Sequence, residues 1–217
     1  MDSGVKAYPA PWDLHGKGYI FIYKFKKDFV EKSGNVPGFL KGSFKGGFGS
    51  VMLVDYETSD AGPYGELLFI PGKFAYGGKK LDTISKIYVS TMESVVNGRA
   101  NWGIPKERAD FSFEKISENE EKATVSVNGK TAAQFTLKTK KLSFPVSTKL
   151  LPFPLVEEYE GKRYFTNFSG SGKGRFAKIV DMKIDPGLFP DVSECKPIAV
   201  IRVAPFDITF PKAEIER

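Results

Sequence analysis

The sequence has little of the side-chain chemistry on which many enzymes rely. Its 217 residues include one cysteine, Cys195, and one histidine, His15. A single cysteine excludes an intramolecular disulfide. With one histidine as well, a His-rich metal site is excluded, as is any His-dependent triad that does not use His15. We therefore expect neither a metal nor another cofactor, and look for chemistry among the carboxylates, lysines and tyrosines.

Long apolar runs and basic blocks are missing too. No apolar run approaches the roughly 18 residues of a spanning helix, and the opening residues 1–4 lack the basic and apolar regions of a signal peptide. The formal net charge is +6, but 32 Lys and Arg residues are scattered among 26 acids, without a zinc, helix-turn-helix or RNP signature. We expect a cytoplasmic protein that binds neither membrane nor nucleic acid. A basic balance can still draw an anionic small molecule toward a cleft.

Aromatic and β-branched residues are abundant, with 19 Phe and 9 Tyr, and they favour strands. Asn128-Gly129 between two alternating runs predicts a β-hairpin, and Gly98 is predicted to cap a short helix. Because closure removes exposed edges, we predict a mainly β fold with an antiparallel sheet that curls or closes, forming a single domain over 1–217. Strands are predicted over 19–25, 50–56, 66–70, 84–91, 123–127, 131–137, 164–169, 176–184 and 198–203, and short helices over 28–33 and 92–97.

One lysine has an unusual setting. Lys106 directly follows Pro105, close behind Trp102 and Ile104. The proline fixes its own φ and keeps the preceding residue out of the helical region, so Lys106 leaves a stiff link. The residues alone allow two interpretations, a solvated loop lysine or a Schiff-base nucleophile. The second needs a neutral amine, which burial among apolar neighbours favours.

Two other features allow a functional and a structural interpretation. Glu66 opens an apolar strand, where it is either a solvated strand-end acid or a desolvated carboxylate suited to moving protons. The segment Gly170-Ser-Gly-Lys-Gly174 lacks the spacing and the following Ser or Thr of a phosphate loop. We predict a hairpin turn there.

The segments around Lys106 and Glu66 resemble the acetoacetate decarboxylase-like family. Gly98-Arg99 followed by Pro105-Lys106 is similar to the Gly-Arg and Pro-Lys-Lys elements that frame the family's Schiff-base lysine. Gly62-Pro-Tyr-Gly-Glu66 resembles its Gly-x-Tyr-x-Glu segment, which carries an active-site glutamate. The resemblance implies that Lys106 is the nucleophile and that Glu66 is catalytic.

Two further segments extend the resemblance over most of the chain. Residues 15–19 resemble the early segment in which the family places a basic residue, here Lys17, and residues 210–214 resemble its closing Pro-Arg-Ala-Glu strand. The resemblance implies an antiparallel β cone or barrel with a mostly apolar cavity and a few short helices. The chain departs from the family at two positions. Glu107 replaces the second lysine of Pro-Lys-Lys, and Val51 aligns with an additional glutamate.

The leading hypothesis is a lyase that acts through a lysine Schiff base on a β-keto acid or related carbonyl substrate, with decarboxylation as the reaction. Lys106 would attack the carbonyl, Glu66 would relay a proton, and Lys17 and Trp102 would bind the substrate. Arg99 is expected to support the loop instead. Alternatives are an aldolase, dehydratase or cyclase on a larger carbonyl compound, and a non-catalytic binding protein that kept the cavity. We also expect a homo-oligomer.

Overall fold

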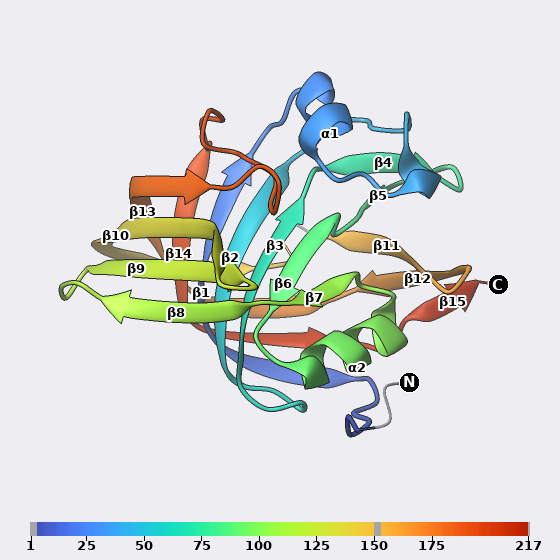
Figure 1. Ribbon diagram of the computed structural model, residues 1–217, viewed down its shortest axis with the longest axis horizontal. Helices are drawn as coiled ribbons and strands as arrows, with labels where there is room; N and C mark the ends of the chain where they lie inside the picture. The colour runs from blue at the N-terminus through green and yellow to red at the C-terminus, as the bar shows by residue number, and fades with distance from the viewer. Residues whose placement is uncertain (1–3, 150–152, 217) are drawn as a thin grey trace.

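Strands make up most of the structure, a computed structural model that describes residues 4–149 and 153–216 (Figure 1). The helical elements are α1 (Lys27–Ser33), the short 3-10 turn η1 (Gly38–Leu40) and α2 (Met92–Trp102). The strands are β1 (Trp12–Tyr23), β2 (Gly49–Thr58), β3 (Tyr64–Ile70), β4 (Lys73–Tyr76), β5 (Lys79–Asp82), β6 (Lys86–Val89), β7 (Lys106–Arg108), β8 (Asp110–Lys115), β9 (Glu120–Val127), β10 (Lys130–Ser147), β11 (Pro154–Tyr159), β12 (Lys162–Asn167), β13 (Ser169–Ile184), β14 (Ala199–Phe210) and β15 (Glu214–Glu216). Within these ranges, no helix has the length and apolar character needed to cross a bilayer.

The larger sheet is strongly curved and almost closes on itself. Its order is β7-β6-β3-β2-β1-β14-β13-β10-β9-β8, and its pairs are antiparallel except for β6 with β7. The two outermost strands, β7 and β8, follow each other in the chain, with Ala109 between them. The sheet therefore curls until its two terminal strands meet end to end through Ala109, and such closure removes exposed strand edges. This confirms the predicted antiparallel β barrel-like fold with few helices.

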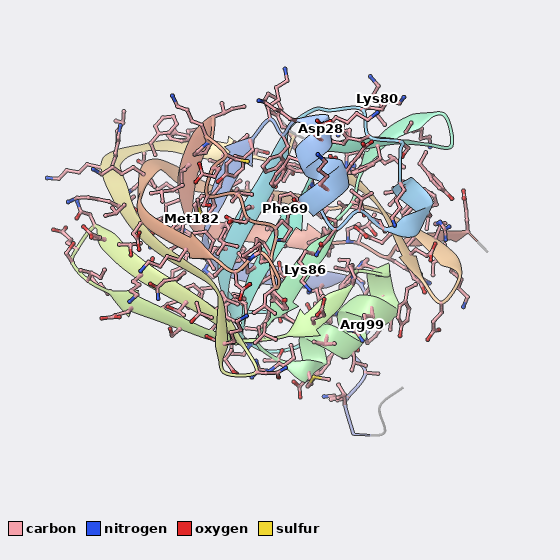
Figure 2. The ribbon with its side chains drawn as sticks, turned by 45° about the horizontal axis from the view of Figure 1, so that its top comes forward. Asp28, Phe69, Lys80, Lys86, Arg99 and Met182 are labelled. Atoms are coloured by element: carbon pink, nitrogen blue, oxygen red, sulfur yellow. The ribbon has the colours of Figure 1, made fainter. Side chains whose placement is uncertain are left out.

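A smaller sheet of order β15-β12-β11-β5-β4 lies beside the larger one, and α2 packs near β7 and this smaller sheet (Figure 1). Figure 2 shows the labelled Phe69 among the strands at the centre and Lys80 at the periphery. Phe69 is fully buried, and Lys80 is exposed. The division into a single domain over 1–217 stays a prediction.

The sheet separates two hydrophobic cores. Along β3, Leu67 and Phe69 pack into the first core, while Leu68 and Ile70 pack into the second. Successive side chains of a strand point to opposite faces, and a strand buried on both faces reads as a continuous apolar run. Glu66 shares the face of Leu68 and Ile70 by the same alternation. The second core is therefore where a carboxylate is buried.

Observed strands overlap every predicted strand range, and the predicted hairpin is confirmed. Asn128 and Gly129 have φ of +50° and +77° and connect β9 to β10. Positive φ at both central residues defines the turn that the Asn-Gly pair favours. Sequence reasoning did not identify the short strands β4, β5, β7 and β15, which depend on tertiary pairing.

The prediction of a hairpin turn at Gly170 to Gly174 was wrong. The segment runs inside β13, between β10 and β14. A Cβ on Gly172 would lie 2.6 Å from the carbonyl oxygen of Pro205, so the glycine permits close approach of the neighbouring chain. The glycines lie within a continuous strand because the segment pairs with β10 on one side and β14 on the other. The backbone hydrogen bonds of this pairing outweigh the low preference of glycine for strands.

The cap of α2 also differs from the prediction. The helix passes through Gly98 and ends at Trp102, and Gly103 is its C-cap, with φ of +67° and an N–H that donates to Arg99 O. A left-handed glycine is a frequent helix terminator. Gly98 serves a different purpose, set by what packs against it.

Candidate active site

Helix α2 and strand β7 together position Lys106. After the left-handed turn at Gly103, Pro105 leads the chain into β7, where Lys106 is the first residue. Arg99 on α2 reaches forward and donates from Nε and Nη2 to the Lys106 carbonyl oxygen, at 2.9 and 2.6 Å. These two bonds tie the backbone of Lys106 to the helix. Arg99 thus has the loop-supporting place expected of it.

Gly98 makes room for the side chain of Lys106. A Cβ at Gly98 would lie 2.6 Å from Lys106 Cδ and 2.8 Å from Cε. The lysine stem therefore runs directly across the helix at the point where no side chain exists. This contact explains a glycine in the interior of a helix, where it lowers stability relative to alanine.

The Lys106 amine is buried and surrounded by three polar groups from two elements, β3 and α2. Its Nζ lies 3.0 Å from Glu66 Oε2, 3.0 Å from Ser94 Oγ and 3.5 Å from Tyr64 Oη. It also lies 5.0 Å from the centre of the Tyr64 ring. Lys106 and Glu66 are each only 4% exposed. The structure therefore joins the two predicted catalytic residues in one buried pair.

Two tyrosines complete the polar cluster. Tyr56 Oη donates to Glu66 Oε1 at 3.1 Å, so both carboxyl oxygens have partners. Burial, followed by the nearby Glu66 carboxylate, raises the pKa of both Tyr56 and Tyr64 well above the ordinary value. Both phenols therefore stay protonated at neutral pH and remain available as hydrogen-bond donors.

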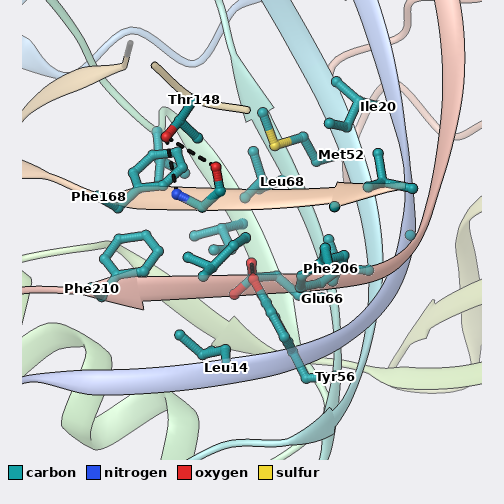
Figure 3. A pocket seen from close by; sticks show the side chains of 18 of the residues that line it. Leu14, Ile20, Met52, Tyr56, Glu66, Leu68, Thr148, Phe168, Phe206 and Phe210 are labelled. Atoms are coloured by element: carbon teal, nitrogen blue, oxygen red, sulfur yellow. Dashed lines mark hydrogen bonds between the residues drawn. The ribbon is translucent and has the colours of Figure 1, made fainter. Parts of the chain in front are cut away.

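The polar cluster opens into a cavity of about 110 Å³ within the second core. Figure 3 shows the Glu66 carboxylate directed into this cavity, with Leu68 and Met52 on one side and Leu14 on the other. Lys106 and Glu66 are the charged residues among the described residues that line it. Most other lining residues are apolar: Trp12, Leu14, Ile20, Met52, Val54, Leu68, Ile70, Ile84, Ile87, Trp102, Ile104, Val146, Phe168, Val203, Phe206, Ile208 and Phe210.

Trp102, expected to bind substrate, lies in the cavity wall. Its Nε1 donates to Pro211 O at 2.7 Å, and its ring meets Trp12 edge to face at a centroid distance of 5.0 Å. The indole is 2% exposed and held on two sides. It can offer a ligand its ring surface, but its N–H group is already bound.

Lys17, also expected to bind substrate, is not brought to the cavity. Its neighbour Gly18 lines the cavity, whereas Lys17 points to the other face of β1, with Nζ 3.3 Å from Asp55 and 3.4 Å from Glu57. Partial desolvation would lower the pKa of Lys17, but the two carboxylates outweigh it and raise the pKa. Strand alternation decides this placement, since residues 17 and 18 must face opposite ways.

The two departures from the family pattern also face away from the amine. Glu107 follows Lys106 in β7 and pairs with Lys86 Nζ at 2.6 Å (labelled Lys86 in Figure 2). Val51 is fully buried in the first core, on the opposite face of the sheet from the cavity. Neither residue touches Lys106, so their effect on the site is indirect.

Three partners of the pair were missed by sequence reasoning. Tyr64 stands two residues before Glu66 in the same strand and so shares its face, a signal that was present in the sequence. Ser94 and Tyr56 come from α2 and β2, and no local pattern connects them with Lys106. Within residues 4–149 and 153–216, no cluster of three His, Cys, Asp or Glu side chains could hold a metal ion.

The sequence matches the family model described as acetoacetate decarboxylase over residues 3–194. No curated protein sequence matches the chain.

Several solved structures share the fold. An acetoacetate decarboxylase from Legionella pneumophila subsp. pneumophila str. Philadelphia 1 is 16% identical, with a TM-score of 0.74, over 96% of this chain and 88% of that one. The enduracididine biosynthesis enzyme MppR is 14% identical, with a TM-score of 0.68, over 95% and 88%. An acetoacetate decarboxylase-like enzyme from Sphingomonas wittichii RW1 is 10% identical, with a TM-score of 0.64, over 96% and 93%. At these identities, the likeness shows a common fold.

Proposed function

Because the chain belongs to the acetoacetate decarboxylase family, we propose that it is a lyase that forms a Schiff base between Lys106 and a β-keto acid or related carbonyl compound. The observation that carries the proposal is the buried contact of 3.0 Å between Lys106 Nζ and Glu66 Oε2 at the polar end of an apolar cavity. A nucleophile within hydrogen-bond reach of a base is the arrangement that covalent catalysis needs.

The reaction begins with a proton transfer inside this pair. Glu66 takes a proton from the Lys106 ammonium, and the neutral amine attacks the ketone carbon of the substrate. The carbonyl oxygen receives one proton back from Glu66 and one from the attacking amine and leaves as water, so that an iminium links the substrate to Nζ and Glu66 is again a carboxylate. The bond between the α-carbon and the carboxylate then breaks. Its electron pair moves toward the iminium nitrogen, which gives an enamine and releases carbon dioxide.

Glu66 also serves the second half of the reaction. After Glu66 takes up one proton from solvent, its carboxyl donates that proton to the α-carbon of the enamine, and water then hydrolyses the resulting iminium to a ketone and free Lys106. Tyr56 holds Oε1 of Glu66 by a 3.1 Å hydrogen bond, which leaves Oε2 directed at the amine. Proton transfer by such a positioned group contributes about 10² to 10⁴-fold in rate.

Water exclusion supports the same chemistry. The cavity lining apart from the cluster is mostly apolar, and Lys106 and Glu66 are each 4% exposed. Electrostatic interactions strengthen in such a water-poor setting. Loss of a carboxylate as neutral carbon dioxide is favoured where charge is poorly solvated. Decarboxylation is therefore the reaction that we propose ahead of carbonyl condensation.

Carbonyl condensation is the second candidate. The enzyme MppR, 14% identical to this chain, has been solved in complex with the condensation product of pyruvate and imidazole 4-carboxaldehyde. An iminium at Lys106 could equally support aldol chemistry, since the same enamine can attack an aldehyde. A non-catalytic protein that binds small molecules in the same cavity remains the alternative from another class.

Borohydride trapping tests the proposal. The protein is incubated with acetoacetate and other β-keto acids, reduced, digested and mapped by mass spectrometry. We expect an adduct on the peptide that contains Lys106, lost in Lys106→Ala and kept in the control Lys17→Ala, whose amine faces away from the cavity. An adduct on other lysines, or none across a broad carbonyl panel, would overturn the mechanism. Intact ligand affinity in Lys106→Ala, without turnover in the wild type, would point to the binding protein.

A further inference from the structure

The charged and phenolic groups that can act on a substrate are gathered at one end of the cavity, while Thr148 and Ser171 also contribute to its lining. Lys106, Glu66, Tyr56 and Tyr64 form a single hydrogen-bonded cluster. Elsewhere in the lining, Thr148 Oγ1 is engaged by the backbone of Gly170, accepting from its N–H at 2.9 Å (Figure 3). The remaining surface presented to a ligand is almost entirely hydrocarbon.

Four aromatic side chains form one continuous side of the cavity, here called the aromatic wall: Trp12, Trp102, Phe210 and Phe168. Successive ring centroids lie 5.0, 5.3 and 4.8 Å apart. Figure 3 shows Phe168, which lies between β12 and β13, and Phe210, the last residue of β14, on the same side of the cavity. Each ring contacts the next, so the wall has no polar interruption.

The indole N–H groups of the wall are turned away from the cavity. Trp12 Nε1 donates to Tyr8 O at 2.9 Å, and Trp102 Nε1 donates to Pro211 O at 2.7 Å. Buried indole N–H groups need such partners. With both satisfied by backbone carbonyls, the tryptophans offer a ligand only apolar ring surface.

Burial decreases along the wall. Trp12 and Trp102 are 1% and 2% exposed, whereas Phe168 and Phe210 are half-buried. The aromatic wall therefore leads from the closed part of the cavity toward solvent. Along this path, no lining residue that the structure describes carries a charge apart from the Lys106 and Glu66 pair.

We infer that the substrate is a β-keto acid with a single negative charge and an uncharged alkyl or aryl chain, which lies along the aromatic wall while the keto group reaches Lys106. The inference rests on the proposed function in one respect, the placement of the reacting carbonyl at Nζ. A second carboxylate on the chain would be desolvated against hydrocarbon with no cation to pair with it, which is costly. Each buried methylene, in contrast, favours binding.

Rates across a series of substrates test whether the substrate carries an uncharged hydrocarbon chain. The series is acetoacetate, β-ketohexanoate, β-keto-octanoate and benzoylacetate, with β-ketoadipate as the doubly charged member. We expect kcat/KM to rise by about fourfold for each methylene buried, until the cavity is filled. We expect β-ketoadipate to be far poorer than β-ketohexanoate, which has the same number of carbons. A flat or falling series, or equal use of β-ketoadipate, would overturn the inference.

The binding of unreactive carboxylates tests this inference independently of the proposed function. Both tryptophans of the chain belong to the aromatic wall, so intrinsic fluorescence reports occupancy directly. Hexanoate, octanoate and adipate are titrated into the wild-type protein. Tighter binding of octanoate than hexanoate, with adipate weakest, supports the inference even if borohydride traps no adduct on Lys106. A trapped adduct without this order of affinities refutes the inference and leaves the proposed function standing.

A matched pair of variants locates the effect. Phe168→Ala shortens the wall at its half-buried end and should lower octanoate affinity at least fivefold while leaving butyrate affinity unchanged. The control is Phe176→Ala in β13. The Phe176 side chain is 47% exposed and does not line the cavity. Equal losses for octanoate and butyrate, or equal effects of the two variants, would contradict a chain lying on the wall.

Discussion

Replacing Gly98 by alanine is expected to disable the site while leaving the fold intact. The added Cβ would lie 2.6 Å from Lys106 Cδ and 2.8 Å from Cε. Carbon atoms in contact prefer about 3.5 to 4.0 Å, so the lysine stem must move by about 1 Å. That shift would break or lengthen the 3.0 Å contacts of the amine with Glu66 and Ser94.

The expected cost is kinetic. A misplacement of about 1 Å in a catalytic group can lower the rate about 100-fold. Stability should change little, because alanine in a helix interior gains about 0.5 to 1 kcal/mol over glycine, which offsets part of the cost of crowding. The two effects separate only because the clash falls on a flexible side chain instead of the backbone.

Three measurements on Gly98→Ala check this reasoning: kcat/KM for a β-keto acid, the initial rate of borohydride-trapped adduct and the thermal midpoint. Gly38→Ala is the matched control, since a Cβ there meets no atom within 4 Å. Activity within about threefold of wild type, with the fold preserved, would refute the positioning role. Loss of folding in Gly98→Ala would refute the prediction that the stem, and not the helix, gives way.

Three further changes probe the groups around the amine and elsewhere in the core. Glu66→Gln should lower kcat by about 10² to 10⁴-fold, the contribution of a positioned proton donor and acceptor; near wild-type turnover would exclude Glu66 from proton transfer. Ser94→Ala removes a 3.0 Å partner of the amine and should lower kcat/KM about tenfold, the value of one hydrogen bond to a charged group; an unchanged pH profile and rate would argue against it. Burial raises the pKa of Glu157 from 4.5 to about 8, against the lowering effects of hydrogen bonds from Ile84 N–H and Thr83 Oγ1. The native state then keeps a proton that the unfolded chain releases, so the free energy of unfolding should fall as pH rises from 4.5 to about 8. Glu157→Gln should flatten that slope in denaturant titrations, and an unaltered slope would contradict the assignment.

Local features of the chain were readable from the sequence. The hairpin at Asn128-Gly129 depends on two residues that tolerate positive φ, and β3 reads as a strand because it is apolar on both faces. Lys106 and Glu66 were identified through short motifs that resemble a family. In each case the information lies within a few neighbouring residues.

The end of helix α2 shows a limit of prediction from local sequence. The start of the helix at Met92 was predicted, but Gly98 was predicted to cap it, whereas Gly103 ends the helix. A glycine that ends a helix and a glycine that admits a neighbouring side chain look alike in sequence. Only the path of Lys106 across the helix distinguishes them.

The side of the sheet on which a residue lies determines whether its side chain reaches the cavity. Lys17 and Glu107 are each one residue away from a cavity-lining position, and strand alternation turns both outward to pair with other charges. By itself the sequence determined most of the longer strands, the hairpin at Asn128-Gly129 and the candidate pair of Lys106 and Glu66. The tertiary structure alone brought those two residues, 40 positions apart, to 3.0 Å, and added Ser94 and Tyr56 to them. Register and curvature of the sheet set these contacts, and they depend on packing among segments that share no local pattern.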